Sequence, residues 1–172
     1  MSITSHKKDV DHMIQTLLRM IDNESSLLMF AEDDFPPCDT LAFVMGKICE
    51  SAHASTMSGV IFAVGMGGLT FQTHDAHEIS KYININMQRM KQVDHLLQEW
   101  LLKEKREGRK YLADREPLTS KKMQFNHMGI VSSVGHTHAA SSFKCGDPMS
   151  NANFPGLNYD ENASPAVFSV ST

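Results

Sequence analysis

Apolar side chains recur at helical spacing near the start of the chain. The members of this stripe follow one another at steps of three and four residues: Val10, Met13, Ile14, Leu17 and Ile21. This spacing predicts an amphipathic helix that begins near Ser5. The apolar pattern resumes at Leu27–Phe30, after a polar stretch that would either bend or continue the same helix.

A second helix is predicted after the pair Pro36 and Pro37, which interrupts any helix before it because each proline lacks an amide donor. Asp39 is a suitable N-cap, since its carboxylate can accept hydrogen bonds from the free amides of a first turn. The apolar residues that follow have the spacing of one buried helical face: Leu41, Val44, Met45, Ile48 and Ala52.

Residues 59–73 have a different pattern, in which two short runs of β-branched and aromatic residues flank a glycine-rich centre. Glycines 65, 67 and 68 can supply the positive φ angles of a turn, so the stretch predicts a β-hairpin. The alternative is a glycine-containing helix end followed by a loop.

The longest predicted helix runs from about Asp75 to Ala113. Its apolar positions step by three, four or seven residues, with one asparagine on the same seam: Ile79, Ile83, Asn86, Met90, Val93, Leu97 and Trp100. Such a register is typical of a bundle helix or a short coiled coil, in which a polar seam residue can specify the oligomeric state. We therefore expect these residues to form an interaction surface.

Net charge divides the chain near Pro117. Residues 1–116 contain 13 Lys/Arg and 17 Asp/Glu, which accounts for the whole net charge of −4, whereas residues 117–172 contain three of each. The second part is rich in Ser, Asn, Gly and Pro and has no helical period, as expected of an extended, weakly structured arm. Its aromatic residues are spaced as docking anchors would be: Phe125, Phe143, Phe154, Tyr159 and Phe168.

These patterns together predict a mainly α fold. It comprises a three-helix domain over residues 1–116 with a long C-terminal helix, a small hairpin near 59–73, and an interaction arm over 117–172. The net charge and the absence of a basic, aromatic-interleaved patch argue against nucleic-acid binding. Residues 51–73 carry no charged side chain, but their strongly apolar part is 13 residues long, shorter than the ~20 that a spanning helix needs.

Three cysteines form no CxxC pair and cannot all be bridged, which favours a reducing compartment. With no N-terminal export signal in the sequence, we expect a cytoplasmic protein. No GxSxG, HExxH, P-loop or GxGxxG pattern is present, and this argues against an enzyme.

Two histidine groups suggest zinc as an alternative. His74 and His77 lie three residues apart, which places both on one face of a helix, although a helix N-terminus with Asp75 and Glu78 in its first turn explains the same residues. In the arm, His136 and His138 would point to one side of an extended segment and could bind zinc together with Cys145.

The expected function is that of a non-catalytic interaction or assembly subunit without a cofactor. It would self-associate or bind protein partners through the long helix and the C-terminal arm. The alternative is a zinc-binding module or a metal-dependent enzyme built on one of the histidine groups.

Overall fold

A computed structural model describes the fold for residues 3–20, 27–32, 35–50, 56–63, 67–126, 144–149 and 167–168. Its centre is a five-stranded mixed sheet in the order β1-β3-β2-β4-β5. The strands are β1 (Leu27–Phe30), β2 (Met57–Ile61), β3 (Leu69–Gln72), β4 (Glu116–Ser120) and β5 (Val167–Phe168). β3 is antiparallel to both β1 and β2, whereas β4 is parallel to β2 and β5 is parallel to β4.

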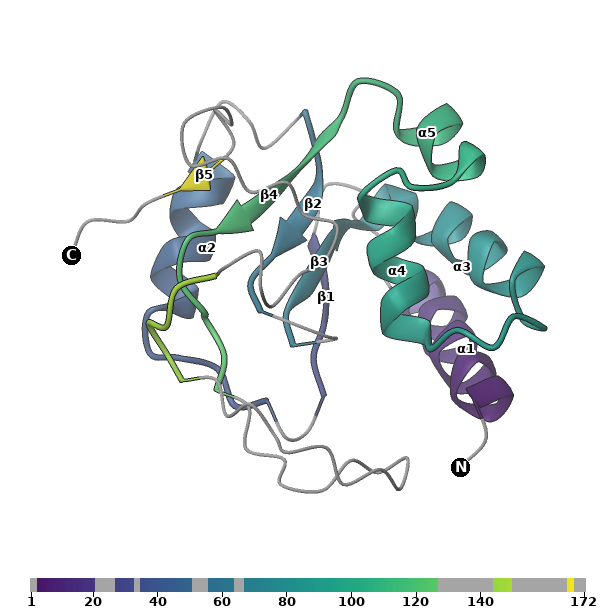
Figure 1. The fold of residues 1–172 in the computed structure, drawn as a ribbon, viewed down its shortest axis with the longest axis horizontal. Coiled ribbons are helices and arrows are strands. Elements are labelled where there is room, and N and C mark those ends of the chain that lie inside the picture. The colour runs from purple at the N-terminus through teal and green to yellow at the C-terminus, as the bar shows by residue number, and fades with distance from the viewer. Residues whose placement is uncertain are drawn as a thin grey trace.

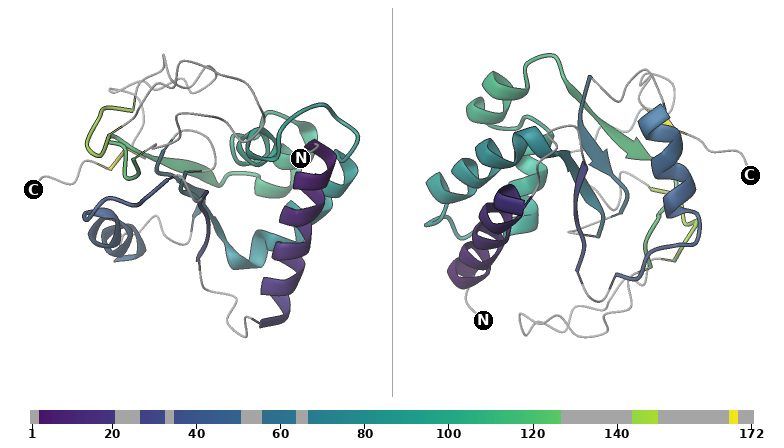
Figure 2. Two further views of the ribbon diagram at one scale, coloured as in Figure 1. Left: turned by 90° about the horizontal axis from the view of Figure 1, so that it is seen from below. Right: turned by 180° about the vertical axis from the view of Figure 1, so that it is seen from behind.

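Five α-helices and one 3-10 turn accompany the sheet among the described residues. They are α1 (Ile3–Met20), α2 (Leu41–Glu50), the 3-10 turn η1 (Thr73–Asp75), α3 (Ala76–Ile85), α4 (Val93–Leu101) and α5 (Arg106–Leu112). The strands lie between α2 and the group formed by α1, α3, α4 and α5 (Figures 1 and 2). α2 is therefore separated from the other helices and has the sheet as its neighbour.

The prediction of a mainly α fold is wrong, because the protein has an α/β fold. Leu27–Phe30, which looked like a resumption of the first helix, is strand β1 and pairs with β3. The hairpin near residues 59–73 is present as β2 and β3, with Gly68 at φ 87° in the turn. It forms the centre of the sheet rather than a small appendage. A four-residue apolar run has no period that could distinguish a strand from a helix.

The long helix predicted over residues 75–113 is also wrong, since the chain there forms α3, α4 and α5. The first break follows Asn86, whose side-chain amide donates to Tyr82 O at 2.8 Å and ends α3. Lys7 of α1 is fully buried and donates to the carbonyls of Asn86 and Met87, at 3.1 and 3.3 Å, and to that of Arg89. A lysine about eighty positions earlier in the sequence thus satisfies the backbone at this break.

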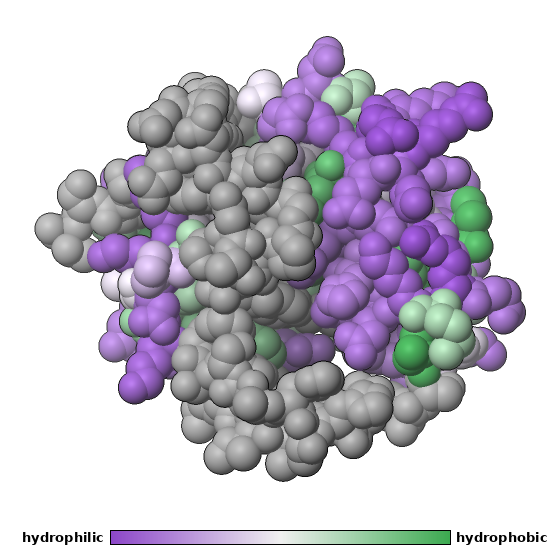
Figure 3. All heavy atoms as spheres, viewed as in Figure 1, coloured by the Kyte–Doolittle hydropathy of each residue, from purple (hydrophilic) through white to green (hydrophobic). Residues whose placement is uncertain are grey.

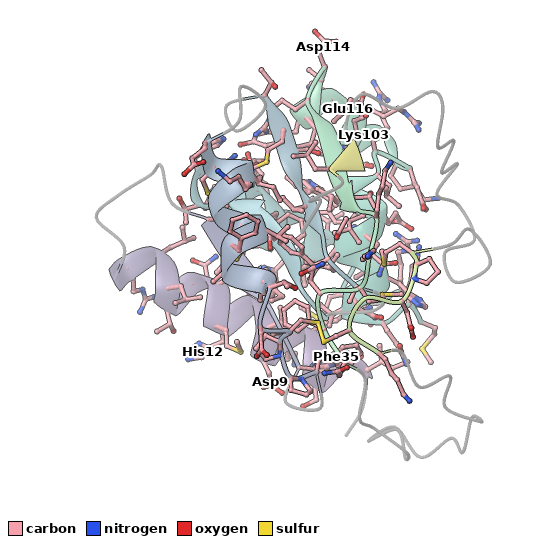
Figure 4. All side chains as sticks on the ribbon, turned by 90° about the vertical axis from the view of Figure 1, so that its left-hand side faces the viewer. Asp9, His12, Phe35, Lys103, Asp114 and Glu116 are labelled. Atoms are coloured by element: carbon pink, nitrogen blue, oxygen red, sulfur yellow. A yellow bond between two sulfur atoms is a disulfide. The ribbon has the colours of Figure 1, made fainter. Side chains whose placement is uncertain are left out.

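The second break follows α4, where Lys103 adopts a φ of 58° and reverses the chain. α5 then packs back onto α4 so closely that a Cβ on Gly108 would lie 2.8 Å from Trp100 O. Lys103 also pairs with Glu116 at the start of β4, and the two lie side by side in Figure 4. These contacts turn the chain from the helices into the sheet.

The boundary predicted at Pro117 runs through β4, which pairs with the full length of β2. Leu118, Met123 and Phe125 are buried in the same core as the helices. Residues 117–126 thus belong to the sheet and its core rather than to an arm. The rest of the predicted arm lies outside the described residues, apart from 144–149 and the two residues of β5.

The core lies where α4 meets the central strands. All five residues of β2 are buried, and Phe71 of β3 contacts Trp100 of α4 with ring centroids 5.9 Å apart. No helix in the described part of the chain is long and apolar enough to cross a membrane.

Candidate functional site

A pocket of about 460 Å³ lies at the N-terminal end of α2. Three segments far apart in the sequence line it: residues 37–44, residues 120–126, and Cys145 with Gly146. Its volume falls within the roughly 300–1,000 Å³ range typical of ligand sites. The pocket is therefore the candidate functional site, and Figure 4 shows the side of the molecule on which α2 lies.

Backbone hydrogen bonds join the first of these segments to the second. The prolines at 36 and 37 hold the chain extended, so that Pro37 forms a bridge with Phe125. Cys38 N donates to Gln124 O at 2.9 Å, and Asn126 N donates to Pro36 O at 3.0 Å. The two prolines thus place residues 37–44 as one wall of the pocket.

The third segment, residues 144–149, attaches to the other side of residues 121–126. Gly146 N donates to Met123 O at 3.0 Å, and Met149 N donates to Lys121 O at 2.9 Å. Cys145 N donates to the side-chain oxygen of Asn126 at 2.8 Å, and the Met149 side chain is buried. Residues 121–126 therefore form the strip that holds both walls.

A disulfide between Cys38 and Cys145 joins the two walls directly, with their Cα atoms 5.7 Å apart and the two cysteines 107 positions apart in sequence. Cys38 is buried and Cys145 is exposed. Cys38 Sγ also lies 3.6 Å from Met123 O. That contact is not a hydrogen bond in the disulfide form, because the sulfur then carries no proton.

The neutral polar groups of the pocket are used to hold its shape. Thr40 Oγ1 donates to Gln124 Oε1 at 2.9 Å, and Gln124 Nε2 donates to Lys122 O at 3.2 Å. By contrast, the side chains of Asp39, Lys121 and Lys122 make no hydrogen bond or ion pair with any other residue that the structure describes. Two cations and one anion at the pocket thus have no side-chain partner within the described part of the chain.

Phe43 supplies the exposed apolar surface beside these charges. It lies on α2, is 54% exposed, and has the Lys47 ammonium 5.8 Å from its ring centroid. Val44 and Ile48 of the same helix are buried and fix α2 to the body of the protein. An apolar helix surface is therefore presented next to the charged side chains of the pocket lining.

The structure does not gather the residues of the predicted zinc sites into one cluster. His74 Nε2 lies 3.1 Å from the Arg115 guanidinium and 3.4 Å from Asp75 Oδ1, and His77 is exposed on α3. Cys145 is in the disulfide, so its sulfur is not a free thiolate, and His136 and His138 lie outside the described residues. Among the residues that the structure describes, no group of three or more His, Cys, Asp or Glu could hold a metal ion.

Most of the predicted interaction seam lies inside the protein's own core. The buried members are Ile79, Ile83, Val93, Leu97 and Trp100. Asn86 ends α3, and Met90 is 87% exposed in the connection between α3 and α4. The surface over α3, α4 and α5 that faces the viewer in Figure 3 is mainly hydrophilic. A continuous apolar seam is thus not presented to a partner.

The aromatic residues predicted as docking anchors are dispersed. Phe125 is buried beneath the turn of the hairpin, where a Cβ on Gly68 would lie 2.3 Å from its ring. Phe168 is in β5, and Phe143, Phe154 and Tyr159 lie outside the described residues.

A second polar cluster, centred on Glu99 of α4, is buried and fully paired. Burial alone would raise the pKa of Glu99, but hydrogen bonds from Arg89, Lys91 and Tyr82 outweigh it and lower the pKa to about 2. Burial and the bond to Glu99 raise the pKa of Tyr82. The charged and phenolic groups of this cluster pair with one another, so we assign it to the framework of the fold.

A third cluster ties η1 to the start of β4. Asp75 is fully buried and accepts two hydrogen bonds from Arg115, at 2.8 and 2.9 Å. The Arg115 guanidinium in turn lies over the Tyr111 ring, 5.5 Å from its centroid. The Asp75 carboxylate, predicted as a charge in the first turn of a helix, is thus the buried member of an ion pair with Arg115.

Sequence reasoning missed the pocket because its walls meet only in three dimensions. The adjacent lysines at 121 and 122 and the Pro-Pro-Cys run were visible, but nothing in their spacing pairs Cys38 with Cys145. Comparison of the chain with known protein families, curated proteins and solved structures finds no match. Function is therefore argued from this geometry.

Proposed function

We propose that this protein is a non-catalytic interaction subunit that binds a segment of a partner protein in the pocket at the start of α2. The observation that carries the proposal is the combination of an open cavity of about 460 Å³ with three charged side chains that have no partner among the described residues. A site of this kind offers charged groups for binding, while its Thr40 and Ser120 hydroxyls donate to Gln124 Oε1 and Lys122 O rather than to a basic side chain.

The chemistry of the site favours a partner segment with an apolar anchor and adjacent carboxylates. Phe43 offers an exposed aromatic surface, and aromatic contacts typically supply much of the energy of protein docking. Lys121 and Lys122 would pair with carboxylates, which would fix the register of the bound segment and favour acidic partners over basic ones. Asp39 would accept from a backbone amide of that segment.

A peptide with the sequence of residues 154–163 is a suitable probe, because it contains two aromatic residues and the adjacent acids Asp160 and Glu161. We expect the labelled peptide to bind the full-length protein in fluorescence anisotropy at protein concentrations below those at which the chain self-associates, because a second copy then does not compete for the pocket. Phe43→Asp and the double change of Lys121 and Lys122 to Glu should each weaken binding about tenfold or more, equivalent to ~1.4 kcal/mol.

Two matched controls distinguish an effect at the pocket from a general effect of changing surface residues. Met13 on α1 is 53% exposed, almost the same as Phe43, so Met13→Asp should leave peptide affinity unchanged. The double change of Lys105 and Lys110 to Glu alters net charge equally at α5, on the far side of the sheet. Equal loss in these controls, or no binding of the peptide to the unmodified protein, would contradict the proposal.

We propose that a second copy of the chain supplies the bound segment, since residues 154–163 have the required aromatic and acidic residues. The oligomeric state of the protein tests this. Light scattering of the full-length protein should then show an oligomer, and Phe43→Asp should convert it to a monomer. An unaffected oligomer would contradict self-association through the pocket.

We further propose that the protein works without a metal cofactor. Elemental analysis of protein purified without added metal tests this. Stoichiometric zinc that is lost on His74→Ala or His136→Ala would instead support the alternative of a zinc-binding module.

The cytoplasm is the proposed compartment, in keeping with an exposed free thiol on Cys49. Disulfides in that compartment are typically transient and catalytic or redox-sensing. The Cys38–Cys145 disulfide then requires its own explanation.

A further inference from the structure

We infer that the Cys38–Cys145 disulfide is a redox switch for the pocket, which is complete in the oxidised protein and loses one wall when a dithiol reduces the bond. This inference rests on the proposed function, because it concerns the regulation of the same binding site. It starts from the fact that the only covalent tie between the two described walls is this bond.

The wall that would move is residues 144–149. It contributes Cys145 and Gly146 to the pocket lining. Its described attachments are the disulfide, the buried Met149 side chain, and four hydrogen bonds and one β-bridge to the strip at residues 121–126. The opposite wall continues into α2, which is fixed by Val44 and Ile48. We therefore expect reduction to loosen residues 144–149 rather than α2.

The difference in exposure of the two sulfurs favours attack of the reductant on Cys145. Cys145 is exposed, whereas Cys38 is 8% exposed. A thiolate of the dithiol attacks Cys145 Sγ, the S–S bond breaks, and Cys38 leaves as a thiolate that takes up a proton. The second thiol of the reductant then breaks the mixed disulfide and releases the Cys145 thiol. Two electrons pass to the protein, and the dithiol becomes a cyclic disulfide.

The reduced Cys38 has an acceptor in place. Its sulfur lies 3.6 Å from Met123 O, so that the new thiol proton has a partner in the protein interior. Reduction therefore leaves no buried polar hydrogen without a partner on that wall. Within the described residues, the two walls are then joined through the strip at residues 121–126.

Hydrogen exchange tests the switch without any ligand. Gly146 N and Met149 N donate to backbone carbonyls of the strip and should exchange slowly in the oxidised protein. After treatment with dithiothreitol we expect the exchange of both amides to accelerate about tenfold or more, while amides of β2 and β3 stay protected. Cys145→Ser should reproduce the reduced state without reductant, whereas Cys49→Ser, at the exposed free cysteine of α2, should behave as the unmodified protein.

Binding of the peptide with the sequence of residues 154–163 then tests the consequence. Its affinity should fall about tenfold or more on reduction and recover on reoxidation. Equal exchange at Gly146 and Met149 in both redox states would overturn the inference, as would failure of Cys38 and Cys145 to pair in the presence of oxidised glutathione. An absence of peptide binding in the oxidised protein would instead contradict the proposed function, and the exchange measurement would still decide whether the wall opens.

Discussion

Arg89 and Glu99 form a two-pronged ion pair, with Nη1–Oε1 and Nη2–Oε2 distances of 2.5 and 2.8 Å, in which the carboxylate is 2% exposed and the guanidinium 35% exposed. Lys91 Nζ lies 2.5 Å from the second carboxylate oxygen, and the Tyr82 hydroxyl donates to the first. The pair joins α4 to the connection that replaces the middle of the predicted long helix. It therefore holds the chain reversal that lets α4 pack on the sheet.

Removal of Arg89 should destabilise the protein, because Glu99 would keep its buried charge with fewer donors. Leaving one partner of a buried pair alone typically costs ~3–5 kcal/mol. For Arg89→Met we expect a loss of about 3 kcal/mol in the free energy of unfolding, at the lower end since Lys91 and Tyr82 still contact the carboxylate. Urea denaturation followed by circular dichroism measures this. Lys81→Ala, which breaks an exposed pair with Glu78, is the control and should change stability by less than ~1 kcal/mol.

The same carboxylate predicts how stability depends on pH. The pKa of Glu99 is lowered from 4.5 to about 2 in the folded protein, so the unfolded chain binds its proton first as the pH falls. Its contribution to stability is present above pH 4.5 and is lost as the pH falls towards 2, by an amount on the order of 3 kcal/mol. Glu99→Gln should therefore be less stable than the unmodified protein at pH 7, with a shallower loss between pH 4.5 and 2. Parallel curves for the two proteins over that interval would contradict this assignment.

Gly59 of β2 tolerates no side chain. A Cβ there would lie 2.2 Å from Thr70 O and 2.8 Å from the Leu101 side chain, so either a strand or α4 must shift. We expect Gly59→Ala to lower the free energy of unfolding by at least ~1–3 kcal/mol. Gly46→Ala is the matched control, because a Cβ on this exposed helical glycine meets nothing within 4 Å. That change should stabilise α2 by ~0.5–1 kcal/mol, and thermal unfolding distinguishes the two signs.

Among the residues that the structure describes, the sheet holds two buried hydroxyls without a hydrogen bond, Ser58 Oγ on β2 and Thr70 Oγ1 on β3. A buried hydroxyl without a partner costs free energy, so its removal without a change in shape should be neutral or stabilising. We expect Thr70→Val to raise the free energy of unfolding by up to ~1–2 kcal/mol. A clear loss of stability would instead indicate that an ordered water satisfies the Thr70 hydroxyl.

Ser80 provides the control for that prediction. It is also buried, but its hydroxyl donates to Asp11 and accepts from Gln15 at 2.6 Å, which ties α3 to α1. Ser80→Ala should therefore lower the free energy of unfolding by ~1–3 kcal/mol. The opposite signs expected for Thr70 and Ser80 separate paired from unpaired hydroxyls.

Some of the fold followed from local patterns alone. Val10 and Ile14 of the predicted stripe are buried on α1, whereas Met13 of the same stripe is 53% exposed and Ile21 lies outside the described residues. The prolines at 36 and 37 precede α2 as expected. The hairpin at residues 59–73 was predictable because its glycines and β-branched runs are turn and strand signals in themselves.

The seven-residue register from Ile79 to Trp100 was misleading for a physical reason. Each of the two helices packs one apolar face on the core, and the connection between them spaces those faces so that the register continues across the break. Asn86 and Met90 are the two seam positions that lie in the connection, at the helix end and in solvent. The interruption depends on Lys7, whose bonds to the connection join residues about eighty positions apart.

The sequence by itself determined where apolar faces lie, where helices can begin, and which residues carry charge. The tertiary structure decided which apolar runs become strands, where the long helical pattern breaks, and that Cys38, Lys121 and Cys145 line one pocket. The physical reason is that side-chain periodicity and capping act over a few neighbouring residues. Strand pairing, a buried lysine and a disulfide across 107 residues instead depend on which distant segments meet when the sheet forms.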